Sequence, residues 1–357
     1  MRIIKGPRGV IPLVVFEDEK VLCFRFGWIG VLEKGSDKFK RLALLENDLL
    51  RRILSFWSIT ARYFGLNEIK AAITNDDCIF ISYHHLFFLY QIKNGDLSQV
   101  RFDFKDSSRA CLYLKSIKDG VIWGEYGYNP QKKRKSVFYY NHQRGEIVKL
   151  YTFGDSQINH IHNIIVDSNT SRIWILTGDF DNSAAIFYTD DFFKTVHCQV
   201  SGSQLYRGCI GYSKDNILYY ATDSPDETNY IIKNKDGVIT KLFELNGSCI
   251  YGVICNGEMF FSTTVENEAN QLNNGKNNFK YNRGRGIKDW YAYLYSFNIK
   301  SEQITTILKS RKDIFPMLAF KYGCFRFPSI NNSSGVVFSW GQALRKYDNH
   351  IIRIILK

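Results

Sequence analysis

The stretches GVIWGEY (120–126), IWILTGD (173–179), ILYYATD (217–223) and FFSTTVE (260–266) decide the fold of this chain. Each is a run of aromatic and β-branched residues, which suit a half-buried pleated strand. Each run reaches a carboxylate at or next to its last residue, and these acids are Glu125, Asp179, Asp223 and Glu266. The acids are spaced by 54, 44 and 43 residues. A polar residue at the same place in consecutive repeats predicts a ring of acids around a shared axis.

The repeat is wider than these four runs. A further strand precedes each run across a polar turn of Asp, Asn and Gly, residues that tolerate the backbone of a tight hairpin. A third strand follows, as in SVFYYN (136–141) and AYLYSFN (292–298). Seven such copies of roughly 50 residues fill the chain, the period of propeller blades. The sequence predicts one all-β domain over 1–357, a β-propeller of seven blades with four antiparallel strands each. Six or eight blades, or a β-sandwich, are the alternatives.

Composition limits the class of protein and its expected cellular location. No run of about 18 apolar residues is present, so we expect no transmembrane helix. The first residues lack the apolar stretch of a signal peptide, and we expect a cytoplasmic location. The eight cysteines lie mainly in predicted strands without a CxxC pair. They are therefore expected to be small buried residues of a reducing compartment, not a disulfide framework or a zinc site.

The formal net charge of +12 favours acidic partners. Two short basic runs, KKRK (132–135) and KSRK (309–312), are not accompanied by any nucleic-acid-binding motif. An acidic oligosaccharide or polysaccharide is therefore the expected partner, and nucleic acid is not. The sequence does not determine an oligomeric state.

Two segments depart from the β pattern. Residues 42–66 carry apolar side chains at helical spacing and predict a helical segment between two blades, packed on the propeller. The spaced apolar residues are Leu45, Leu49, Ile53, Phe56 and Trp57. Its arginines at 51, 52 and 62 make a membrane-surface helix the alternative. Residues 267–288 are rich in Asn and Gly and predict a flexible loop inserted into the sixth blade.

A second polar series precedes the acid-ended strands. It comprises His160, His162, Tyr206, Arg207 and Tyr251, and its spacing indicates equivalent positions in successive blades. Because residues i and i+2 of a strand share a face, the two histidines should point the same way, roughly 7 Å apart. Such a pair suits acid–base catalysis or two ligands of a zinc-like metal. Spacing indicates no third ligand, so we expect no cofactor, with a metal at the histidine pair as the alternative.

Arg207 carries a planar fork that suits a carboxylate. With His162 it could hold the carboxylate of a sialic or uronic acid, and a salt bridge to Asp179 or Asp223 is the equal alternative. Lys312 and Asp313, just before the seventh blade, could complete the ring.

Two hairpins resemble the Asp-boxes of BNR, or sialidase-like, propellers, whose pattern is Ser-x-Asp-x-Gly-x-Thr-Trp. In AIFYTDDFFKTV (185–196), Thr189, Asp191 and Thr195 match the pattern, while Phe193 and Val196 depart from it. In SVFYYNHQRGEIV (136–148) Gly145 matches, with Asn141 and Gln143 as polar substitutes.

The motifs GEYGYN, HIH, TGD, LYRG, ATDSPDETN, STTVE and RKD occur in this order. Over residues 70–330 they resemble BNR-type glycosyl-hydrolase-like proteins of bacterial surface-polysaccharide gene clusters. The resemblance implies a propeller that acts on carbohydrate. The three substrate-binding arginines and the Tyr–Glu nucleophile pair of sialidases have no counterparts here.

Three functions remain open from the sequence. As a glycoside hydrolase, the leading hypothesis, the protein would use two of its four recurrent acids as general acid and as nucleophile or base. As a uronate lyase, it would use His162 or Tyr206 to remove a proton while Arg207 neutralises the substrate carboxylate. As a binding module it would only hold an acidic glycan or a protein. The catalytic candidates are Glu125, His162, Asp179, Tyr206, Asp223 and Glu266, and the substrate-binding candidates are His160, Arg207, Tyr251, Lys312 and Asp313.

Overall fold

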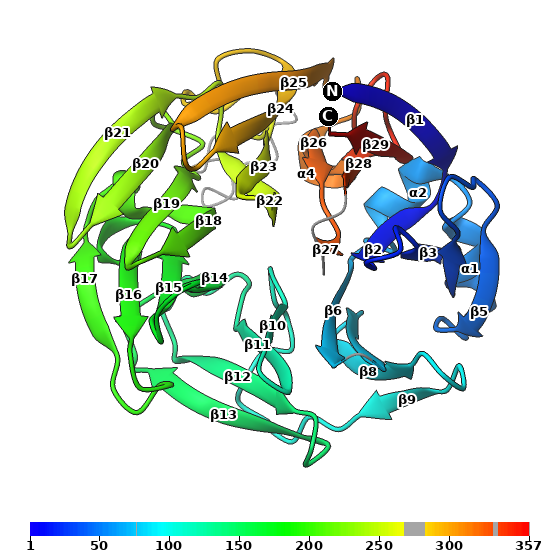
Figure 1. The fold of residues 1–357 in the computed structure, drawn as a ribbon, viewed down its shortest axis with the longest axis horizontal. Coiled ribbons are helices and arrows are strands. Elements are labelled where there is room, and N and C mark those ends of the chain that lie inside the picture. Colours follow the sequence, from blue (N-terminus) through cyan, green and yellow to red (C-terminus); the bar gives the residue numbers. More distant parts are fainter. Residues whose placement is uncertain (76, 268–282, 331–334, 357) are drawn as a thin grey trace. The chain divides into compact units, whose positions relative to one another are not determined.

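The computed structural model describes residues 1–75, 77–267, 283–330 and 335–356. Their strands form seven sheets, each built on four antiparallel strands, and one sheet has a short fifth strand (Figure 1). The predicted all-β fold class, a seven-bladed β-propeller, is confirmed. The chain divides into two compact units. The first unit is Met1–Ile69, Pro225–Thr228 and Asn246–Lys357, and the second unit is Lys70–Ser224 and Asn229–Leu245.

The second unit contains four sheets whose strand order follows the chain. The first two sheets are β6 (Ile69–Asn75), β7 (Cys78–Tyr83), β8 (Leu86–Gln91) and β9 (Leu97–Val100), then β10 (Lys115–Ile117), β11 (Gly120–Gly124), β12 (Lys135–Asn141) and β13 (Glu146–Phe153). The next two are β14 (His160–Val166), β15 (Ile173–Gly178), β16 (Ala185–Thr189) and β17 (His197–Ser201), then β18 (Gly208–Lys214), β19 (Ile217–Thr222), β20 (Tyr230–Lys235) and β21 (Val238–Glu244). Each predicted acid-ended strand is the second strand of its sheet.

The first unit contains three sheets. They are β2 (Ile11–Val15), β3 (Val21–Arg25), β4 (Trp28–Leu32) and β5 (Lys40–Leu44); β22 (Cys249–Cys255), β23 (Glu258–Thr263), β24 (Tyr291–Asn298) and β25 (Gln303–Arg311); and β26 (Cys324–Arg326), β28 (Val336–Gln342), β29 (His350–Ile355) and β1 (Arg2–Arg8). The short strand β27 (Ser329–Ile330) pairs in parallel with β2. The last sheet ends with β1, so the chain start, and not the C-terminal strand, supplies its outermost strand.

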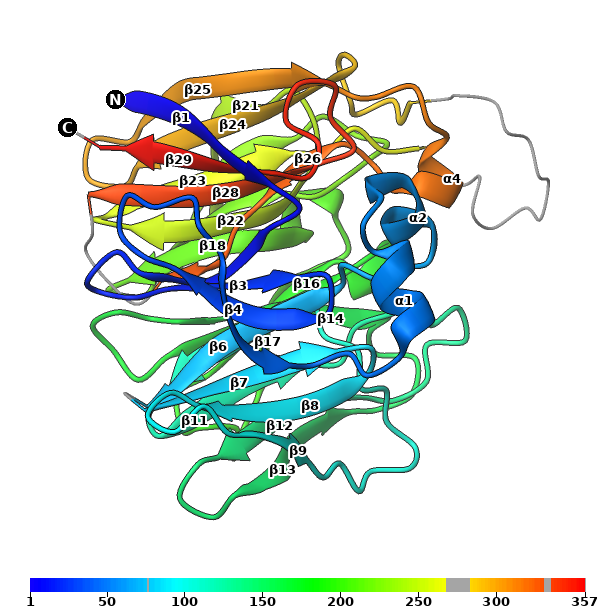
Figure 2. The same ribbon diagram turned by 90° about the vertical axis from the view of Figure 1, so that its right-hand side faces the viewer.

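Within the described residues of the first unit, three short helices are present (Figure 2). Segment 42–66 contains α1 (Leu49–Leu54), which begins after its N-cap Asp48, and α2 (Ser58–Tyr63); α4 (Met317–Phe320) contacts α2. The apolar face that we expected to pack inward is largely exposed: Leu49 is 64% and Trp57 59% exposed. Arg62 is instead buried and pairs with Asp313 at 2.6 Å. The ion pair of Arg62 therefore helps to hold α2, beside the buried Ala61 and the ring contact of Tyr63 with Phe320.

The cysteines, the helices and the inserted loop were also subjects of sequence-based expectations. Cys198 is exposed, the other seven cysteines are buried, and all eight are free thiols. Among the described residues, no helix has the length and apolar character needed to span a membrane. Of the predicted loop, residues 268–282 lie outside the described residues.

The hairpin between β16 and β17 explains why the sequence matches part of the Asp-box pattern there. The Asp191 carboxylate accepts hydrogen bonds from the backbone and hydroxyl of Thr195 at 2.9 and 2.8 Å, and from the Thr189 hydroxyl at 2.9 Å. These bonds lower the pKa of Asp191 to about 2. The three matching residues thus stabilise the turn of this hairpin by hydrogen bonds. This structural role does not identify a family.

Aromatic packing fills the space between the first two sheets of the second unit. Phe80 of β7 stacks on Tyr140 of β12 at 4.8 Å and on Trp123 of β11 at 5.4 Å between ring centroids. All three side chains are at most 2% exposed. Because each large buried ring contributes much apolar area, this contact joins two neighbouring blades.

A buried carboxylate joins the next two sheets. Asp167, directly after β14, accepts hydrogen bonds from the Ser213 hydroxyl of β18 and from the backbone of Asn216, Asn169 and Thr170. Burial by itself would raise the pKa of Asp167, but these hydrogen bonds outweigh it and hold the pKa below its usual value. Asp167 is therefore ionised in the folded protein at neutral pH.

We expect Asp167→Asn to lower stability by about 1–3 kcal/mol at pH 7, because an amide leaves some of these donors without an acceptor. A lowered folded-state pKa means that this stabilisation is present above the unfolded pKa of about 3.9 and is lost as pH falls through the folded value. The difference in free energy of unfolding between the parent and the variant should therefore become smaller below about pH 4. Urea unfolding across pH measures it, with the exposed Asp103→Asn as control. Equal stability at pH 7 would contradict this role.

Candidate functional site

Five of the predicted residues converge at one edge of two neighbouring sheets in the second unit. His160 and His162 begin β14, Asp179 directly follows β15, Arg207 directly precedes β18, and Asp223 directly follows β19. In an antiparallel hairpin the start of one strand lies beside the end of the next, and His160 indeed pairs with Gly178. Because β14 and β18 are in contact, the two hairpins bring their polar ends together. These five residues are called the His–Asp–Arg cluster below.

A β-bulge places His162. The pairing of β14 with β15 shifts between Ile161 and Asn163, so His162 is the extra residue. The same shift occurs in β18 between Gly208 and Ile210. The structural counterpart of His162 is therefore Cys209, and Arg207 corresponds to His160. Spacing alone had aligned Arg207 with His162, because a bulge cannot be read from residue counts.

The two imidazoles meet through their Nε2 atoms, which lie 2.9 Å apart. Each Nε2 also lies 3.3 Å from the same oxygen, Oδ1 of Asp179. The opposite ring nitrogens face backbone carbonyls: His160 Nδ1 is 3.1 Å from the Gly127 oxygen, and His162 Nδ1 is 3.1 Å from the Gly208 oxygen. Carbonyl oxygens only accept hydrogen bonds, so both Nδ1 atoms carry hydrogen. In neutral imidazoles both Nε2 lone pairs then point at each other.

Asp179 is held as an anion. Burial by itself would raise its pKa, but the neighbouring Arg207 guanidinium opposes burial, and the pKa is held far below its usual range. Arg207 Nη2 is 3.1 Å from Oδ1, and Asn159 donates to Oδ2 at 3.1 Å. Burial lowers the pKa of His160 despite Asp179. Asp179 consequently cannot act as a general acid.

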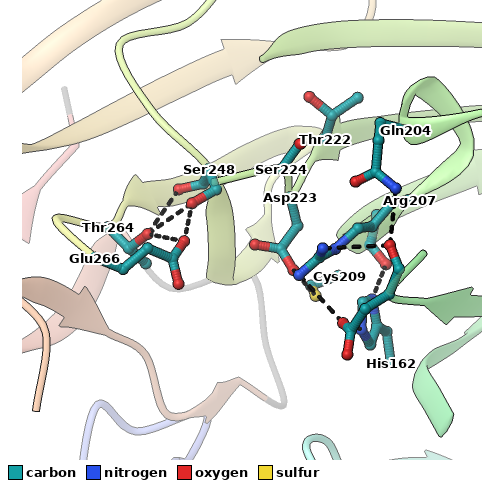
Figure 3. Close-up of polar contacts among 12 residues, drawn as sticks. His162, Gln204, Arg207, Cys209, Thr222, Asp223, Ser224, Ser248, Thr264 and Glu266 are labelled. Atoms are coloured by element: carbon teal, nitrogen blue, oxygen red, sulfur yellow. Dashed lines mark hydrogen bonds and ion pairs between the residues drawn. The ribbon is translucent and has the colours of Figure 1, made fainter. Parts of the chain in front are cut away.

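Arg207 joins the two carboxylates. Its Nη2 also lies 3.5 Å from Asp223 Oδ2 (Figure 3). The side chain of Arg207 is 9% exposed. Both salt bridges that the sequence allowed are therefore present at once. The Cys209 thiol donates to Asp223 Oδ2 at 3.2 Å, and burial raises the pKa of Cys209 well above its usual value. Cys209 is accordingly a neutral thiol.

Two catalytic candidates of the second unit have other contacts. Glu125 is 2% exposed and accepts hydrogen bonds from the backbone of Ser108 and, at 2.7 Å, of Ser136. Burial raises the pKa of Glu125, with these hydrogen bonds opposing it. Tyr206, in the 3-10 turn Gln204–Tyr206, packs against the apolar cluster around Trp174. The Glu125 carboxylate thus holds the backbone at Ser108 and Ser136 in place, and Tyr206 contributes to apolar packing.

Four candidates belong to the first unit. Glu266 accepts hydrogen bonds from the Ser248 and Thr264 hydroxyls (Figure 3). The Tyr251 hydroxyl is 2.9 Å from that of Tyr322.

Lys312 and Asp313 form a buried ion pair in the same unit. Asp313 also pairs with Arg62, and burial lowers the pKa of Lys312. This network fixes α2 to the segment that leads into α4.

Sequence reasoning missed several neighbours of the cluster. The Tyr126 ring lies 4.4 Å from the His160 ring between centroids, and Tyr126 is half-buried. Gln204 donates to the Asp179 backbone oxygen at 2.8 Å. The signal for Tyr126 was its place directly after the recurrent acid Glu125, whereas nothing in the pattern marked Gln204.

Two groups of side chains within the described residues could hold a metal ion. One is His160, His162 and Asp179, and the other is His162, Cys209 and Asp223. The first provides the third ligand that the spacing of the histidines could not indicate.

Comparisons with known proteins show the fold. No family model matches the chain, and no curated protein matches its sequence. Among solved structures, the oligogalacturonate lyase of Vibrio parahaemolyticus has a TM-score of 0.57 at 10% identity, over 98% of this chain and 90% of that one. An oligogalacturonate lyase in complex with manganese has a TM-score of 0.54 at 9% identity, over 99% and 91%. YCF48 bound to D1 peptide has a TM-score of 0.54 at 8% identity, over 100% and 97%. The BNR resemblance is not confirmed.

We expect Gly178→Ala to disrupt the imidazole pair. A Cβ at Gly178 would lie 2.2 Å from His162 Cε1 and 2.5 Å from its Nε2, so the ring must move. Histidine nitrogen NMR should show that His162 loses the Nδ1–H pattern of the parent, and overpacking should cost about 1–3 kcal/mol. Gly154→Ala is the control, because its Cβ meets nothing closer than 3.5 Å. An unchanged His162 signal would show that the ring is not confined as described.

Proposed function

We propose that this protein cleaves an acidic oligosaccharide or polysaccharide by β-elimination at the His–Asp–Arg cluster. In this reaction a base removes the proton α to a uronate carboxylate, the electron pair forms the C4–C5 double bond, and the C4–O glycosidic bond breaks. The departing oxygen recovers the proton from the protonated base. The reaction needs a positive centre at the substrate carboxylate, because that charge makes the α proton acidic.

One observation carries the proposal: three nitrogen side chains meet at one carboxylate oxygen. His160, His162 and Arg207 all lie within 3.3 Å of Asp179 Oδ1. The planar Arg207 guanidinium is the cation of the cluster, and its fork is a suitable partner for a carboxylate. The net charge of +12 adds a general attraction for acidic chains.

Hydrolysis by two carboxylates is less well supported. It requires one carboxylic acid that is protonated near neutral pH beside a second carboxylate. Asp179 is an anion because its pKa is held very low, and the Glu125 carboxylate is occupied by two backbone amides. The hydrolase hypothesis therefore ranks behind elimination.

Tyr126 is the proton acceptor that we propose. Its ring centroid lies 4.4 Å from that of His160. Tyr126 is half-buried whereas both imidazoles are buried, so Tyr126 is the more accessible group. His162, the base expected from the sequence, is instead occupied by His160, Asp179 and the Gly208 carbonyl.

The substrate class is part of the proposal. Two solved structures that share the fold carry the name oligogalacturonate lyase. At 9–10% identity this likeness concerns the fold alone, and a fold supports many reactions. The chemistry of the cluster, not the likeness, is the reason to test uronates first.

We expect Tyr126→Phe to lower the elimination rate by about 10²–10⁴ without unfolding the protein, since it removes one proton-transfer group. Tyr128→Phe, two residues away and 81% exposed, is the matched control. The assay is absorbance near 235 nm on a panel of uronate-containing oligosaccharides, with reducing ends counted in parallel.

Each other result identifies a different function. Reducing ends without new absorbance would mean hydrolysis. Saturable binding of an acidic glycan without either signal would support a binding module. Equal rates for Tyr126→Phe and the parent would remove Tyr126 from the mechanism.

A further inference from the structure

We propose that His160 Nε2, His162 Nε2 and Asp179 Oδ1 bind one divalent transition-metal ion, of the class of Zn²⁺ or Mn²⁺. Binding of the ion rests on the contacts of the three side chains alone. Its part in elimination rests on the proposed function.

Three acceptor atoms face one another in this cluster. Both Nδ1 atoms donate to carbonyl oxygens, of Gly127 and Gly208, so the two Nε2 atoms present lone pairs. These Nε2 atoms are 2.9 Å apart, and each is 3.3 Å from a carboxylate oxygen. Lone pairs at these distances repel unless a positive species lies among them. A proton or a metal ion can supply that charge.

The distances fit a metal ion. Ligands at about 2.0–2.2 Å from a common ion, at angles near 90–105°, are separated by about 2.8–3.5 Å. The three separations of 2.9, 3.3 and 3.3 Å lie within this range. Two histidines and one carboxylate on one side of an ion leave its other positions open for a substrate oxygen or water.

The surroundings of the three atoms are those of metal ligands. A histidine that binds a metal usually donates its other N–H to a carbonyl or carboxylate, which fixes the tautomer and the ring. Both imidazoles do so. Asp179 is likewise oriented, by Arg207 on Oδ1 at 3.1 Å and by Asn159 on Oδ2 at 3.1 Å.

Charge gives the ion a function. With neutral imidazoles, the carboxylates of Asp179 and Asp223 and the Arg207 guanidinium leave one net negative charge in the cluster. A second anion, such as a uronate carboxylate, would be repelled. A divalent ion reverses the sign, so the cluster would then attract the carboxylate and hold it at the open positions.

The second candidate group is less suitable. It would need the thiolate of Cys209, but this buried thiol donates a hydrogen bond to Asp223. His162 can serve only one of the two groups through its Nε2 atom. We therefore place the ion at His160, His162 and Asp179.

The test is calorimetry of the full chain after dialysis against a chelator, with Zn²⁺ and Mn²⁺ as titrants and Mg²⁺ as an oxygen-preferring comparison. We expect one ion per chain. His160→Ala, His162→Ala and Asp179→Asn should each weaken binding more than the 10–100-fold that loss of an outer-shell partner costs. Asp179→Asn keeps the side-chain shape and addresses the case in which a histidine variant fails to fold. His197→Ala, an exposed histidine of β17, should bind as the parent does.

A second measurement uses Co²⁺. The visible spectrum of the parent with Co²⁺ should show bands of nitrogen and oxygen coordination that disappear in His160→Ala. Folded parent that binds no ion, or binds it equally well in both histidine variants, would overturn the proposal.

The metal site and the proposed function can fail separately. Stoichiometric metal binding without any elimination would leave the metal site and remove the reaction. Elimination that persists undiminished in chelator would leave the reaction and remove the metal from it.

Discussion

The Asp179 carboxylate is the constraint on which the site depends. It is an anion at the end of β15, and three nitrogen side chains from β14 and the segment before β18 lie within 3.3 Å of one oxygen. Burying such an anion is costly unless it is paired. Two neighbouring sheets therefore each contribute partners, and the same contacts that satisfy Asp179 define the electrostatics of the cluster.

Polar groups join blades elsewhere by the same means. Asp167 joins β14 to β18 through Ser213 and the turn at Asn216. In the first unit, Arg62 and Asp313 hold α2. Each of these groups is satisfied by its neighbours. The His160–His162 pair differs, because its protein contacts leave two lone pairs facing each other. An arrangement of this kind is expected at a functional site and not at a structural cross-link.

Much of the fold could be predicted from the sequence because the two strands of a hairpin are close together in the chain. Alternating apolar runs and turn residues predicted the first, second and third strands of the blades, and the spacing of four acids marked the ends of their second strands. The sequence also predicted that the two histidines share a face, and a salt bridge of Arg207 to Asp179 or Asp223 was one of two equal alternatives for that residue. It did not predict that β1 completes the last sheet, because that pairing joins residues more than 300 positions apart.

The sequence by itself determined the blade repeat, the strand ends and the residue types that meet there, since period and turn chemistry act over a few residues. Tertiary structure decided which of those residues form a site. A bulge shifts His162 into register with Cys209, which no residue count reveals. The carbonyls of Gly127 and Gly208 fix both imidazole tautomers. They come from segments distant in the chain, and their direction depends on backbone geometry, which residue identities do not encode.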